Sequence, residues 1–123
     1  MNIEKFKAIY NESRNGCNGF YRHPFARLFQ YSDGVKDLAD EGCHWLLDIC
    51  ATELPAIMRR AGEPHCMLTI EVKKGKATLA LSPTDDNNIW TKKIPYTDLP
   101  DGTWSFELAD EGERFAMILI SEH

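Results

Sequence analysis

Residues 66–81 read CMLTIEVKKGKATLAL and carry the clearest structural signal in the chain. Apolar and polar side chains alternate on both sides of Lys74 and Gly75, with the period of two that is typical of strands with one buried face. Lys74 and Gly75 interrupt this alternation and predict a tight turn. The stretch therefore predicts an antiparallel β-hairpin.

The strand pattern continues downstream. Trp104, Phe106 and Leu108 fall on one side of a further strand. Residues 115–120 are apolar at every position, which indicates a strand buried on both faces, with a partner subunit as one candidate for the second cover. Turns as short as those predicted here join antiparallel neighbours. We predict a meander of four to five antiparallel strands, at residues 66–72, 77–81, 89–96, 103–108 and 115–120.

Upstream of Pro64 the apolar residues recur every three to four positions, the rhythm of amphipathic helices. Asn2 is suited to cap a first helix that ends near Ser13. Pro24 suits the first turn of a short second helix, since its missing N–H has no partner there. The buried stripe of this second helix would consist of Phe25, Leu28 and Phe29.

Two more helices follow before the sheet. Ser32 or Asp33 is expected to cap a short helix that ends at Gly42. A longer helix is expected over residues 43–61. Pro55 lies inside it and should kink or split it near Glu53, because proline removes a backbone hydrogen bond.

The expected architecture is one α+β domain over residues 1–123. Its N-terminal helices, in residues 1–63, pack on one face of a C-terminal antiparallel sheet, in residues 64–123. The 123-residue length and the 43% hydrophobic content suit a single buried core. We expect a cytoplasmic protein without a membrane segment. The reason is that the chain has neither an apolar run of about 18 residues nor an apolar signal segment.

The net charge of −5 is unevenly distributed. Basic residues are few and scattered, so direct binding of nucleic acid is not expected. Residues 95–113 contain no Lys or Arg, and they predict an acidic edge that complements a basic groove on a protein partner. The candidate binding residues of this edge are Asp98, Asp101, Glu107, Asp110, Glu111 and Glu113.

The sequence predicts no metal, no cofactor and no catalytic residue. The cysteines are irregularly spaced and are expected to be reduced. Neither Cys-x₂-Cys nor His-x₃-His occurs, and such close pairs are typical of zinc sites. A Cys17–His23 nucleophile lacks a surrounding signature, and the glycine patterns of phosphate-binding loops are absent.

A second candidate binding site combines aromatic, basic and acidic side chains of the helical half. Polar aromatics and Arg suit interfaces and small pockets, since each offers a large area and a directed hydrogen bond. The alternative is a structural network, in which Asp48 pairs with Arg22 or His23. The residues of this second candidate are Tyr21, Arg22, His23, Tyr31, Asp33, Trp45 and Asp48.

Four elements carry a resemblance to a known family. They are Tyr21-Arg22-His23, Tyr31-Ser32-Asp33-Gly34-Val35, Trp45-Leu46-Leu47-Asp48 and Ile94-Pro95-Tyr96-Thr97-Asp98. In this order the chain resembles a family of small bacterial and phage-borne domains of unknown function, over about residues 20–121. His44 stands where that family tends to have Tyr, and Ser32 where it tends to have Thr.

The resemblance implies a passenger of phages or other mobile elements. Small acidic proteins of that origin often bind host proteins. Our leading hypothesis is therefore a non-enzymatic protein-binding module, with inhibition of a bacterial defence (CRISPR) complex as one such activity. One alternative is a small-ligand or enzymatic domain with Tyr21, His23, Asp33 and Asp48 around a pocket. A homodimeric scaffold is another.

Overall fold

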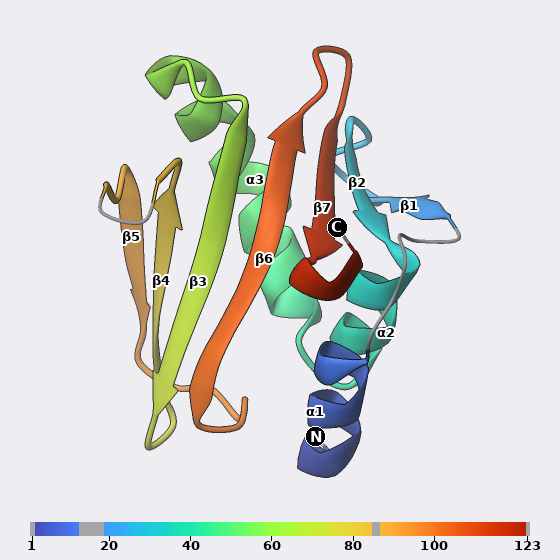
Figure 1. Cartoon of the computed structure of the whole chain (residues 1–123), viewed down its shortest axis with the longest axis vertical. Coiled ribbons are helices and arrows are strands. Elements are labelled where there is room, and N and C mark those ends of the chain that lie inside the picture. Colours follow the sequence, from blue (N-terminus) through green and yellow to red (C-terminus); the bar gives the residue numbers. More distant parts are fainter. Residues whose placement is uncertain (1, 13–18, 85–86, 123) are drawn as a thin grey trace.

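A computed structural model describes residues 2–12, 19–84 and 87–122 (Figure 1). Three α-helices, seven strands and a short 3₁₀ helix lie in these residues. Their order is α1 (Ile3–Asn11), β1 (Phe20–Arg22), β2 (Phe29–Ser32), α2 (Asp33–Asp40), α3 (His44–Ala61), β3 (His65–Lys73), β4 (Lys76–Ser82), β5 (Trp90–Ile94), β6 (Gly102–Asp110), β7 (Phe115–Leu119) and η1 (Ile120–Glu122).

The strands form one mixed sheet in the order β1-β2-β7-β6-β3-β4-β5. Only the β2–β7 pair is parallel among the described strands. Figure 1 shows α3 behind the sheet, where its Leu47, Leu54 and Met58 are buried in the core. The α+β class is confirmed. The expected count of four to five strands, all antiparallel, is wrong.

The first correction concerns residues 20–31, which do not form a helix. They contain β1 and most of β2, with a turn between them, and β2 pairs with β7. Of the expected buried stripe only Phe29 is buried, whereas Phe25 and Leu28 are exposed. The aromatic residues of this stretch suit strands, and Pro24 fits the turn as well as it fits a first helical turn.

The second correction concerns the path of the sheet. Strand β6 does not lie beside β5 but crosses back to pair with β3, so that β3 to β6 form a Greek key in place of a meander. The connection, residues 95–101, passes the β3–β4 turn, where the Thr97 N–H donates to the Gly75 carbonyl at 2.8 Å. Leu99 is buried, and the Trp104 Nε1–H donates to the Pro100 carbonyl at 2.9 Å. These contacts hold the crossover against the core.

Strand β7 lies inside the sheet, between β2 and β6. Its Phe115, Met117 and Leu119 are buried on the helix side. On the opposite side Ala116 is buried and Ile118 is half-buried. The fully apolar sequence of this strand therefore reflects its central position.

Local signals in the helical half are mostly confirmed. The Asn2 side chain caps α1 by accepting the Lys5 N–H at 3.0 Å, and the Ser32 hydroxyl caps α2 by accepting the Val35 N–H at 3.2 Å. Helix α3 runs through Pro55 as one helix, so of the two outcomes expected at Pro55, a kink or a split, the split did not occur. Burial of Leu54 and Met58 on either side of Pro55 holds the two halves together. No helix in the described residues is long and apolar enough to span a membrane.

Candidate functional site

His23 organises the turn between β1 and β2. Its ring is buried, with 2% of the residue exposed. Nδ1 accepts the backbone N–H groups of Phe25 at 3.2 Å and Ala26 at 3.1 Å. Nε2 lies 2.8 Å from Oδ1 of Asp48 on α3. Because Nδ1 accepts two hydrogen bonds, the ring proton is on Nε2 and is donated to Asp48.

The turn itself, the β1–β2 loop (residues 23–28), is tied down at several further points. The His23 N–H donates to the Phe29 carbonyl at 2.9 Å, and the Phe29 N–H donates to the Ala26 carbonyl at 2.9 Å. The Phe115 N–H of β7 donates to the Leu28 carbonyl at 2.8 Å. Both ends of the loop are therefore fixed to the sheet, and His23 fixes its interior.

This loop displays the most exposed large apolar side chain among the described residues, Phe25, at 84% exposure. Leu28 follows at 62%. Exposed Arg22 and Arg27 border them in the sequence. A rigid backbone that presents an apolar tip with basic neighbours has the composition of an interface hot spot.

The other residues of the second candidate binding site lie in three places. The Tyr21 and Tyr31 rings stack at 6.0 Å, on the side of the β1–β2 pair where α2 lies. Trp45 is half-buried against the core, and Asp33 is in the first turn of α2. The alternative of a structural network is supported for the pairing of Asp48 with His23.

A chain of charged groups continues from the tyrosine pair along α2. Lys36 Nζ lies 5.3 Å from the centre of the Tyr21 ring and 2.8 Å from Asp40 Oδ2. The hydrogen bond with Asp40 raises the pKa of Lys36, and the same bond lowers the pKa of Asp40. Burial raises the pKa of Tyr31. These contacts link the tyrosine pair to α2.

The expected acidic edge is divided between distant places. Asp98 and Asp101 precede β6, and Asp101 accepts the Lys74 N–H at the β3–β4 turn. The acidic residues of the β6–β7 turn lie at the opposite end of β6, a strand of nine residues that spans about 30 Å. These residues are Asp110, Glu111 and Glu113. Asp110 pairs with Arg59, and Glu111 pairs with Arg114. Glu107 lies between the two ends, on the sheet face opposite the helices.

Sequence reasoning missed Glu122, a carboxylate that is 4% exposed beneath the start of α2. Its Oε1 accepts the Ser32 hydroxyl at 2.5 Å and the Leu119 N–H at 2.9 Å. Its Oε2 accepts the Gly34 N–H at 3.3 Å. A Cβ on Gly34 would lie 2.7 Å from Oε2, so this motif glycine makes room for the carboxylate. The one indication of this contact in the sequence was a residue without a side chain, Gly34, two positions after the capping Ser32.

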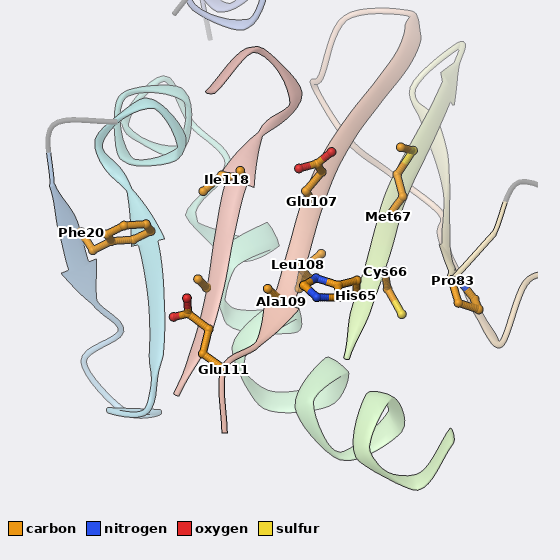
Figure 2. Close-up of a pocket in the computed structure, with 11 residues that line it drawn as sticks. Phe20, His65, Cys66, Met67, Pro83, Glu107, Leu108, Ala109, Glu111 and Ile118 are labelled. Carbon is orange, nitrogen blue, oxygen red and sulfur yellow. The ribbon is translucent and has the colours of Figure 1, made fainter. Parts of the chain in front are cut away.

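A hollow of about 470 Å³ lies on the sheet face opposite the helices (Figure 2). None of Tyr21, His23, Asp33 and Asp48 lines this hollow. One sequence signal pointed there: apolar Met67 stands among the polar positions of β3. The apolar lining residues are Phe20, Met67, Pro83, Leu108, Ala109, Ala116 and Ile118, beside Cys66.

The described cysteines, Cys43, Cys50 and Cys66, are buried free thiols. Burial raises the pKa of Cys43 to about 12 and that of Cys66 to about 11, and it also raises the pKa of Cys50. Cys17, the nucleophile considered above, lies outside the described residues. No group of three or more His, Cys, Asp or Glu within residues 2–12, 19–84 and 87–122 is placed to hold a metal ion.

This burial predicts unreactive thiols in the native protein. Because iodoacetamide is attacked by the thiolate, the raised pKa leaves little reactive species at pH 8. Alkylation of Cys43, Cys50 and Cys66 should be at least about a hundredfold slower than that of a free cysteine. Mass spectrometry of timed samples measures this, with urea-unfolded protein as the control. Labelling of Cys43 or Cys50 at the rate of a small thiol would contradict the burial.

Comparison with known proteins identifies a family. No curated protein matches the chain, and no solved structure matches it. The model of the family of unknown function DUF6876 matches residues 12–123 of the 123-residue chain. The match therefore spans every strand of the sheet in the described residues. The chain is a member of the family of unknown function DUF6876.

Proposed function

We propose that this protein is a non-enzymatic protein-binding module and that the β1–β2 loop is its principal anchor. The observation that carries the proposal is the exposure of Phe25, 84%, on a loop that a buried histidine holds in place. An exposed phenylalanine costs free energy in water, and burying it in a partner recovers that cost. The buried His23 supports the same view, because it fixes the loop from within.

A preformed loop favours tight binding. Association costs less when the anchor side chain and its backbone are already ordered. Aromatic and Arg side chains that enter a partner pocket can each contribute about 2 kcal/mol or more. Phe25 and Leu28 would supply the apolar contact, while Arg22 and Arg27 would pair with carboxylates at the rim of the partner's pocket.

The geometry of His23 also speaks against a catalytic role for this cluster. A general base needs a ring nitrogen that can reach a substrate. Both nitrogens of His23 are hydrogen-bonded within the chain, and the ring is buried. This supports the binding module over the enzymatic alternative.

The proposed partner is a cytoplasmic protein of a bacterial host, with a CRISPR nuclease complex as the first candidate. This part of the proposal rests on the resemblance to phage-borne domains. The acidic residues do not form one edge in the structure, so the anchor loop replaces them as the proposed contact. The partner surface should accordingly be apolar and acidic.

Capture of purified CRISPR nuclease complexes by the immobilised protein tests the proposal. Phe25→Asp should reduce capture at least about thirtyfold, the effect of losing a hot-spot side chain. Tyr96→Asp is the matched control, because Tyr96 is also an aromatic residue, 82% exposed, beside the β3–β4 turn at the other end of the sheet. It should bind like the unchanged protein. Equal capture by all three proteins would refute the anchor, and no capture of any complex would refute the partner.

A further inference from the structure

The hollow on the face opposite the helices is a second candidate site, separate from the β1–β2 loop. Its floor is built by three adjacent strands, β3, β6 and β7. Strand register places Met67 beside Glu107 and Glu107 beside Ile118, so these three side chains form one row across the floor. Figure 2 shows Phe20 and Pro83 at opposite sides of this row.

The hollow is apolar with a negative bias. Two of the described residues that line it, Glu107 and Glu111, are acidic, and none is Lys or Arg. The other titratable residues of the lining are His65 and Cys66. Glu107 is half-buried in the floor and already has an interaction within the chain, so an incoming cation would share its carboxylate. Apolar contact and a positive charge are therefore the two properties that a complementary ligand needs.

The shape of the hollow favours a peptide over a compact small molecule. Phe20 belongs to β1 and Met67 to β3, and four strand spacings separate these strands, which corresponds to about 19 Å. An extended chain covers this length with about six residues. Small-molecule sites enclose most of their ligand, whereas this hollow lies along an open sheet face.

We propose that the hollow binds an extended peptide segment of a protein partner, about six residues long, with an apolar side chain two positions from a Lys or Arg, so that both face the floor. The apolar side chain packs against Met67, on one side of Glu107. The cation lies beside Glu107. The site uses none of the residues of the β1–β2 loop.

Two methionines make the test direct. Met67 lies in the hollow, whereas Met117 is buried on the opposite face of the same sheet. The protein carries ¹³C-labelled methionine methyl groups and is titrated with the peptide acetyl-Leu-Ser-Arg-Ser-Leu-Ser-amide, whose Leu and Arg side chains point to the same face of an extended chain. The matched peptides have Gln or Glu in place of Arg. We expect the Arg peptide to shift the Met67 methyl signal with saturation, while the Met117 signal stays in place.

Charge variants locate the cation. Glu107→Gln should weaken binding of the Arg peptide about fivefold. Glu71→Gln is the control, since Glu71 is on the same strand face as Met67 but outside the lining. It should bind as the unchanged protein does. Thermal unfolding of both variants verifies that they are folded.

Four results would overturn the proposal. The first is the absence of a Met67 shift with any peptide. The second is equal binding of the Gln and Arg peptides, which removes the role of charge. The third is equally tight binding of hexylammonium, which assigns the hollow to a small molecule. The fourth is a Met67 shift with protein concentration alone, which assigns the hollow to a second copy of the chain. Each result is independent of the capture by the β1–β2 loop.

Discussion

Replacing Gly34 with alanine is expected to lower the free energy of unfolding by about 2–3 kcal/mol. The same change within a helix ordinarily raises it by about 1 kcal/mol. The reversal comes from Glu122, whose Oε2 and Cδ would lie 2.7 and 2.8 Å from the new Cβ. The carboxylate has little freedom to move, since the Ser32 hydroxyl and the Leu119 N–H both donate to it. Urea unfolding followed by circular dichroism measures the change.

A cycle with Glu122 separates this contact from other effects. Glu122→Ala alone should cost about 3 kcal/mol, because it leaves buried donors of Ser32, Gly34 and Leu119 without an acceptor. In that background Gly34→Ala should cost nothing, because the obstructing atoms are gone. Glu122→Gln keeps the size of the side chain, so Gly34→Ala should remain costly there. An equal cost of Gly34→Ala in all three backgrounds would contradict the account.

Replacing His23 with alanine should cost about 3 kcal/mol. The change removes a buried ring and leaves the Phe25 and Ala26 N–H groups without their acceptor. Asn at position 23 offers an acceptor near the Nδ1 position, whereas Gln offers a donor near Nε2. His23→Asn should therefore retain more stability than His23→Gln, as measured by urea unfolding.

Asp48→Asn provides the control for the other side of the ring. The Asp48 side chain is 61% exposed, and the Asn oxygen can still accept the Nε2 proton, so the cost should stay below about 1 kcal/mol. A cost for His23→Ala as small as that for Asp48→Asn would mean that His23 does not hold the loop.

The parts of the fold that depend on local chemistry were predictable. Lys74 and Gly75 both have positive φ, 52° and 76°, as a tight hairpin turn requires. Ser32 caps α2 as expected. The order of the strands was not predictable in this way, because β2 pairs with β7 across more than 80 residues of sequence. No local pattern encodes such a pairing.

The candidate sites show the same limit. Asp101 and Asp110 are close in the sequence, yet β6 extends between them and puts them at opposite ends of the sheet. Phe25 was assigned to a buried stripe because apolar spacing indicates burial, although the structure exposes it. The pairing of His23 with Asp48 was anticipated as an alternative, since a polar network was weighed against a binding role. Glu122 was missed because two of its partners, Ser32 and Gly34, lie about 90 residues away in the sequence.

Amide hydrogen exchange at Phe25 and Ala26 tests the central claim, that a buried histidine holds an exposed loop in one conformation. Both N–H groups donate to Nδ1 of His23, so they should exchange far more slowly than amides of an open loop. In His23→Gln their protection should disappear, while the amides of the β3–β4 hairpin keep theirs. Exchange of both amides at the unprotected rate in the unchanged protein would contradict the claim.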